Sequence, residues 1–161
     1  MRLFVAVATA LTAASLAPAL AFAVLWYSLG GKEAISILPI AFLASLLIAG
    51  AHALLLGTPA VAWLLYKRSF ALRSMLVAGF VVGVGPAAIM LNPYMVASSG
   101  TSSWSDGAWK IKDGVPTLAG WIDYLQQLGY AGVLGVIGGI AFYLVYRAIK
   151  PSTSPAPGVR S

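Results

Sequence analysis

The only histidine of the sequence, His52, lies in a long apolar stretch and is the first residue that could carry chemistry. An ionisable side chain inside a membrane is costly to bury, so by default it marks a candidate functional site. Because histidine changes its charge near neutral pH, His52 could bind and release protons. The alternative, which we favour, is a neutral imidazole hydrogen-bonded to an adjacent helix, since the predicted spans contain no acidic partner.

Other catalytic arrangements receive little support. A serine nucleophile needs a base within about 3 Å, but the serines of residues 98–105 are predicted outside the membrane, whereas His52 is predicted inside it. Asp106 and Asp113 each precede a glycine, a pattern typical of tight turns rather than of acid–base pairs. One histidine and no cysteine also argue against a metal site with imidazole or thiolate ligands. We therefore predict no enzyme, no metal and no cofactor.

The polar segment between the third and fourth apolar stretches is rich in tryptophan. Residues 103–114 alternate partly between polar and apolar side chains and contain two Asp-Gly pairs, which predicts a small hairpin. Trp104, Trp109 and Trp121 form a candidate surface for a partner or for lipid. Tryptophan is enriched at binding hot spots and equally at lipid headgroups, and we favour the lipid interpretation for these three.

The composition explains where these residues must sit. Of the 161 residues, 60% are apolar and 9% are charged, whereas soluble domains have about 45–50% and about 25%. A small soluble domain cannot hide so many apolar side chains, and the absence of cysteine excludes a disulfide-stabilised secreted module. The chain is therefore predicted to be an integral membrane protein.

A transmembrane helix needs about 20 mostly apolar residues, and four stretches meet this requirement. They are residues 3–27, 36–56, 75–95 and 128–146. We therefore predict an all-α membrane protein, a four-helix bundle that forms a single domain over residues 1–150. Residues 97–120 are the loop outside the cytoplasm between the third and fourth helices. The Pro- and Ser-rich residues 151–161 are predicted to be a disordered cytoplasmic tail.

Glycine and proline residues predict breaks in two of the helices. After residue 56, Gly57 and Pro59 are expected to end the second span and to leave a short interfacial helix over residues 60–66. A single tilted and kinked helix is the alternative. Pro86 and Pro93 are expected to break the third helix, either as a kink or as a solvated gap that lines a cavity.

The first apolar stretch resembles a signal peptide in its small residues, Ala19-Leu20-Ala21 and Ala21-Phe22-Ala23. The apolar residues continue through Trp26 and Tyr27, however, where a mature secreted chain would turn polar. We therefore expect the first helix to be retained rather than cleaved.

Basic residues predict the orientation, because the side of a membrane protein that carries more lysine and arginine is usually cytoplasmic. In a four-span topology seven basic residues fall on one side: Arg2, Lys67, Arg68, Arg73, Arg147, Lys150 and Arg160. Only Lys32, Lys110 and Lys112 fall on the other side. Both termini are thus predicted in the cytoplasm, and the membrane is predicted to be a bacterial-type inner membrane. Basic residues that flank helices fit anionic lipid, so no nucleic acid is expected.

Small residues spaced four apart predict where the helices touch. Gly79 and Gly83 lie in the third span, and Gly135 and Gly139 lie in the fourth. This spacing keeps each pair on one helical face, and small residues allow close backbone approach in lipid. We expect the closest contact between the third and fourth helices.

These observations favour a non-catalytic membrane protein that acts through protein or lipid contacts, such as an accessory or assembly subunit or an immunity-type protein. The expected partners are membrane lipids and either a protein partner or further copies of the chain. The alternative is a carrier or channel for a small solute or for protons, formed by several copies around His52.

Overall fold

The structure is a computed structural model that describes residues 2–97 and 100–149, and helices dominate it. Helix α1 runs from Arg2 to His52, a short π-helix, η1, covers Ala53–Gly57, and helix α2 covers Thr58–Tyr66. Helix α3 covers Leu72–Met90 and the short α4 covers Pro93–Val96. Helix α5 covers Leu118–Ile149. The predicted tail over residues 151–161 lies outside the described residues.

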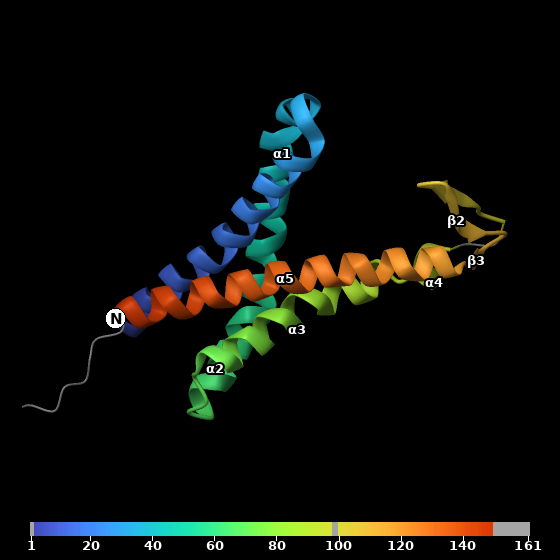
Figure 1. The fold of residues 1–161 in the computed structure, drawn as a ribbon. Coiled ribbons are helices and arrows are strands. Elements are labelled where there is room, and N and C mark those ends of the chain that lie inside the picture. Colours follow the sequence, from blue (N-terminus) through green and yellow to red (C-terminus); the bar gives the residue numbers. More distant parts are fainter. Residues whose placement is uncertain (1, 98–99, 150–161) are drawn as a thin grey trace, which may run out of the picture.

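Within the described residues, four helical segments are long and apolar enough to cross a membrane. They are Phe4–Ser28, Ile35–Tyr66, Leu72–Met95 and Leu118–Ile149. The ribbon of α1 reverses its direction, so that this one element supplies the first segment and part of the second (Figure 1). The sequence-based prediction of a mostly helical chain with four such segments is therefore confirmed.

The predicted break at Gly57 and Pro59 is different in the structure. The helix does not end there but widens into the π-helical turn η1 and continues as α2. The backbone N–H of Thr58 donates to the Ala53 carbonyl, five residues back, and the Thr58 hydroxyl approaches the same oxygen at 3.4 Å. Pro59 has no N–H to donate, and it lies in the first turn of α2, directly after η1. Gly57 and Pro59 thus mark a local change from π-helix to α-helix rather than the end of the helix.

The three strands between α4 and α5 form an antiparallel meander in the order β1, β2, β3. They cover Ser103–Ser105, Ala108–Lys112 and Val115–Pro116. Each connection is an Asp-Gly pair with positive φ at both residues: 50° and 75° at Asp106 and Gly107, and 51° and 79° at Asp113 and Gly114. Such two-residue turns match the twist of antiparallel strands. The predicted hairpin is thus present, with a short third strand added to it.

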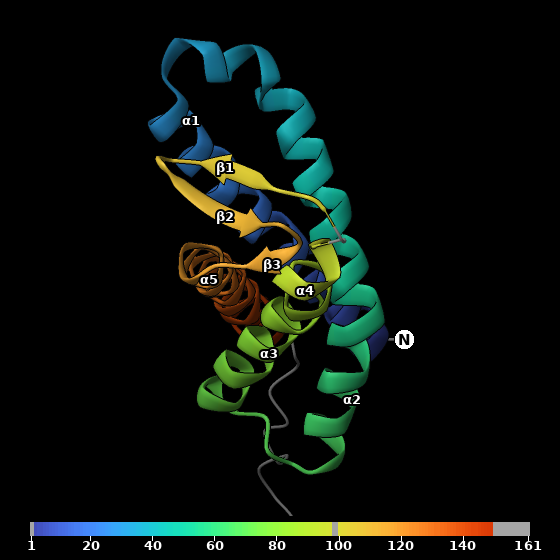
Figure 2. The ribbon, with the colours of Figure 1, turned by 90° about the vertical axis from the view of Figure 1, so that its right-hand side faces the viewer.

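Figures 1 and 2 show how these elements are arranged. Helix α5 spans the molecule, with the sheet and α4 beside its first residues and the α2–α3 turn nearer to its last residues. We call these two ends the sheet end, residues 93–97 and 100–123, and the basic end, which carries Lys67, Arg68, Arg73 and Arg147. Helix α3 packs along α5. The first half of α1 starts beside the last residues of α5 and diverges from it, and the second half returns past α5 toward the α2–α3 turn (Figure 1).

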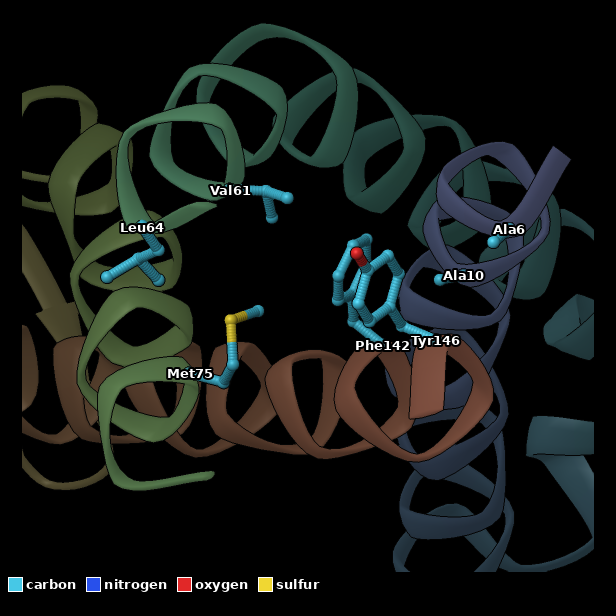
Figure 3. Close-up of a cluster of buried hydrophobic side chains, with 7 residues drawn as sticks. All are labelled: Ala6, Ala10, Val61, Leu64, Met75, Phe142 and Tyr146. Atoms are coloured by element: carbon cyan, nitrogen blue, oxygen red, sulfur yellow. The ribbon is translucent and has the colours of Figure 1, made fainter. Parts of the chain in front are cut away.

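The buried core lies toward the basic end and joins α1, α2, α3 and α5 (Figure 3). It consists of two alanines of α1 and five larger side chains: Ala6, Ala10, Val61, Leu64, Met75, Phe142 and Tyr146. Ala6 and Ala10 are completely buried, so these methyl groups let α1 approach α5 closely. The core therefore fixes the helices to one another at the basic end.

Candidate functional site

The sheet is attached to α5 through Thr117, the residue just before the helix. Its backbone N–H donates to the Lys110 carbonyl at 3.0 Å. Its single hydroxyl hydrogen lies between the carbonyl oxygens of Trp109 and Lys110. The hydroxyl oxygen accepts a hydrogen bond of 3.2 Å from the backbone N–H of Gly120. The last contact caps the first turn of α5. One threonine thus begins the helix and binds the central strand to it.

Strand β2 lies so close to α5 that only glycine fits at position 120. A Cβ atom on Gly120 would come within 3.0 Å of the Lys110 carbonyl oxygen. The Lys110 ammonium group lies 3.8 Å from a carboxylate oxygen of Asp106 and 3.9 Å from one of Asp123. Lys110 therefore links the first Asp-Gly turn with the second turn of α5 through two long ion pairs.

This fixed sheet presents two tryptophan rings. Trp104 and Trp109 are opposite one another in the register of β1 and β2, and their ring centroids are 5.1 Å apart in an edge-to-face contact. Their exposed fractions are 56% and 43%. An edge-to-face contact stabilises the two rings against one another by about 0.5–1.5 kcal/mol, so the exposed pair has a preferred geometry.

Trp121 belongs to a separate aromatic cluster on the helices. Its ring centroid is 5.6 Å from that of Tyr94, which lies on α4, and 5.7 Å from that of Tyr124. The Tyr124 hydroxyl donates to the Ala88 carbonyl of α3 at 2.9 Å. The three tryptophans that the sequence grouped together therefore form two surfaces, and only Trp104 and Trp109 belong to the sheet.

The two predicted breaks of the third helix differ from one another. Pro86 lies inside α3, which continues through it to Met90. Pro93 starts α4, where the Asn92 side chain accepts a hydrogen bond of 3.0 Å from the Tyr94 backbone N–H and caps the new helix. Only Pro93 therefore separates two helices.

His52 is the last residue of α1 and directly precedes η1. Its Nδ1 lies 2.6 Å from the Ile48 carbonyl oxygen, one turn back on the same helix. A carbonyl oxygen can only accept, so Nδ1 is the donor in this contact. The hydrogen bond expected to an adjacent helix is instead made within α1.

The glycines predicted to pack the helices lie in the contact between α3 and α5. A Cβ on Gly79 would fall within 3.0 Å of the Gly135 carbonyl oxygen, and the reverse also holds. Gly83 faces the Ala131 carbonyl and Gly139 faces the Met75 carbonyl in the same way. The two backbones therefore touch along several turns.

A further glycine of α5, absent from the sequence-based prediction, contacts α1. A Cβ on Gly138 would lie 2.9 Å from the Ala14 carbonyl oxygen. Pro18, four residues after Ala14, has no N–H to bond that carbonyl within the helix. The Ala14 carbonyl oxygen, which lacks this donor in its own helix, therefore packs against Gly138 of α5. Helix α5 thus has contact glycines on two faces, one toward α3 and one toward α1.

Three residues that make contacts between elements, Thr117, Tyr124 and Phe70, were not predicted as site residues from the sequence. Phe70, in the α2–α3 turn, contacts three rings of α5. A threonine directly before a predicted helix is a known capping signal, so Thr117 could have been found. The partners of Tyr124 and Phe70 depend on tertiary contacts.

The described site consists of two exposed tryptophan rings on the sheet and an aromatic cluster on the helices. In the part of the chain that the structure describes, no group of three His, Cys, Asp or Glu residues is placed to hold a metal ion. The four helical segments that are long and apolar enough to cross a membrane fit a multi-pass membrane protein. No family model, curated protein or solved structure matches the chain.

Proposed function

We propose that this chain is a small, non-catalytic integral membrane protein that binds a protein partner through the Trp104–Trp109 pair of the sheet. The observation that carries the proposal is the exposure of both rings on a sheet that Thr117 and Lys110 fix to α5. An accessory or assembly subunit or an immunity-type protein would need such a surface and no catalytic groups.

The fixed geometry favours a protein partner over lipid. Large aromatic rings contribute much of the binding energy at protein interfaces, and a surface that is already ordered loses little entropy on binding. Trp121 and Tyr94, on the helices, are suited to the headgroup level. If Trp121 and Tyr94 occupy the headgroup level, the Trp104–Trp109 pair on the sheet is free to contact a protein.

The proposed topology has four crossings, with both termini in the cytoplasm of a bacterial-type inner membrane and the sheet end outside the cytoplasm. The excess of lysine and arginine at the basic end supports this orientation. A cysteine introduced at Lys112 and one introduced at Ser154 should react with a membrane-impermeant thiol reagent from opposite sides. Equal labelling from one side would contradict the topology.

The partner contact can be tested by capture in mild detergent. The tagged protein should retain a stoichiometric partner, and replacing Trp104 and Trp109 with alanine should reduce recovery at least tenfold. Trp63→Ala is the matched control, because Trp63 is 61% exposed but lies on α2. Repeated recovery of the wild-type protein alone, or unchanged capture by the double variant, would rule out the proposal.

Loss of capture must not result from loss of the sheet. Hydrogen exchange of the Ala108–Lys112 amides in the double variant should remain within a few-fold of wild type. Trp104→Phe with Trp109→Phe keeps two aromatic rings and should retain more capture than the alanine variant. If both double variants lose capture equally while the amides exchange freely, the pair is structural and the proposal fails.

A second candidate function is proton-coupled transport by several copies of the chain around His52. It is favoured by the position of His52 immediately before η1, because π-helical turns occur frequently at functional sites. In proteoliposomes, His52→Gln should abolish a pH-dependent flux seen with the wild-type protein. An unchanged flux, or none in the wild type, removes this candidate.

A further inference from the structure

The basic end of the molecule carries four exposed cationic side chains, which lie on the α2–α3 turn, on α3 and on α5. Lys67 and Arg68 lie in the α2–α3 turn, and Arg73 lies in the first turn of α3. Arg147 lies in the last turn of α5. All four are exposed, and arginine remains charged at any pH that a protein tolerates.

An aromatic cluster joins the α2–α3 turn to the last turns of α5. The Phe70 ring centroid lies 4.6 Å from that of Tyr146 and 5.8 Å from that of Tyr143, and Phe142 stacks on Tyr146 at 5.9 Å. Tyr146 is 2% exposed. Because Phe70 lies between Arg68 and Arg73 in sequence, this packing fixes the turn that carries the cations against the end of α5.

The aromatic rings also restrain two of the cations directly. The Arg147 guanidinium donates to the Tyr143 hydroxyl at 3.0 Å and lies 5.6 Å from the centre of that ring. The Lys67 ammonium lies 5.9 Å from the centre of the Tyr66 ring. These contacts orient the cationic groups without neutralising their charge, since a phenol ring is an uncharged partner.

The surrounding sequence contains no acid that could neutralise this end. No Asp or Glu occurs between Ala34 and Ser105, or after Asp123. The ion pairs of Lys110 with Asp106 and Asp123 are at the sheet end. Exposed apolar side chains adjoin the cations, among them Trp63, Leu72 and Val77. The cations thus lie where apolar helix surface meets the polar end of the spans.

We propose that the basic end binds the headgroups of anionic phospholipids, with Arg73 and Arg147 as its principal contacts. Guanidinium groups bind phosphate oxygens through paired hydrogen bonds, and basic residues at the end of a span attract anionic lipid. The adjoining apolar helix surface accommodates the acyl chains of the same lipid. This combination favours a lipid over a soluble anion, which has no apolar part.

The test measures lipid selectivity by electron paramagnetic resonance. The full chain is placed in phosphatidylcholine vesicles with spin-labelled phosphatidylglycerol or spin-labelled phosphatidylcholine. The wild-type protein should associate with the anionic lipid severalfold more strongly. R73Q/R147Q should lower this ratio at least threefold, whereas R73K/R147K, which keeps both charges, should retain most of it.

The matched control is K110Q/K112Q, which removes the same charge from the sheet end and should leave the ratio unchanged. An unchanged ratio in R73Q/R147Q, or an equal fall in the control, would overturn the proposal. Inorganic phosphate at millimolar concentration should not displace the lipid, and displacement would also overturn it. If the glutamine variants do not fold, the same lipid ratio is measured for the wild-type protein at increasing salt. It should fall as salt rises from about 0.02 M to about 1 M, and an unchanged ratio refutes the proposal.

Discussion

The Tyr124 hydroxyl of α5 donates a hydrogen bond of 2.9 Å to the Ala88 carbonyl oxygen of α3. Helix α3 ends at Met90, and the Asn92 N–H bonds the Ile89 carbonyl at 3.4 Å instead of the Ala88 carbonyl, four residues back. Tyr124 therefore satisfies a backbone acceptor that the end of the helix leaves free. At the basic end the same two helices are joined by apolar packing.

Replacing Tyr124 with phenylalanine should destabilise the protein by about 1–2 kcal/mol, because the Ala88 carbonyl loses its donor while the ring remains. The free energy of unfolding in mixed detergent and SDS measures this change. Tyr130→Phe is the control, since Tyr130 is on the same helix and is 64% exposed. Equal effects of the two changes would show that the 2.9 Å contact contributes nothing particular.

The contact between α3 and α5 should tolerate no added methyl group. Gly79→Ala or Gly135→Ala would force two backbones apart, and we expect a loss of about 1–3 kcal/mol or more in the free energy of unfolding. Gly85→Ala and Gly129→Ala lie on the same two helices with no atom within 4 Å of the added Cβ. These controls should be neutral or gain up to about 1 kcal/mol from the better helix propensity of alanine. Equal destabilisation at all four positions would show that the contact is looser than described.

The glycine contact illustrates what could be predicted from the sequence. A spacing of four residues places Gly79 with Gly83, and Gly135 with Gly139, on single faces without any knowledge of the partner. The two Asp-Gly turns were equally accessible, because Asp and Gly tolerate positive φ. Both features depend only on local helix and turn geometry, so they can be predicted without knowledge of tertiary contacts.

Three features were not predicted from the sequence, each for a different physical reason. Pro59 shows that one donor is missing, but the sequence does not say whether the helix then ends or widens, as it does over Ala53–Gly57. Strand Val115–Pro116 is too short to show a period of two. Tyr124 could not be assigned, because its acceptor exists only where α3 ends.

Thr117→Ala should loosen the sheet from α5. The variant loses the helix cap and the hydroxyl contacts with strand β2, and removing such a cap costs about 1–2 kcal/mol. Hydrogen exchange of the Ala108–Lys112 amides should accelerate about tenfold, which corresponds to about 1.4 kcal/mol. Thr12→Ala is the control, because the Thr12 hydroxyl bonds only the Ala8 carbonyl of its own helix among the contacts described. If amide exchange in β2 is the same in both variants, Thr117 does not hold the sheet.

Lys110→Met should have a smaller effect than Thr117→Ala, although Lys110 makes two ion pairs. Their N–O distances are 3.8 and 3.9 Å, and the Asp106 side chain is 85% exposed. Solvent screens such pairs, which contribute at most about 1 kcal/mol each and often less. Amide exchange in β2 should therefore accelerate less than about fivefold, and about 1 M salt should reproduce most of that change in the wild-type protein. An effect of Lys110→Met that exceeds the effect of Thr117→Ala would mean that charge, rather than the threonine hydrogen bonds, fixes the sheet on α5.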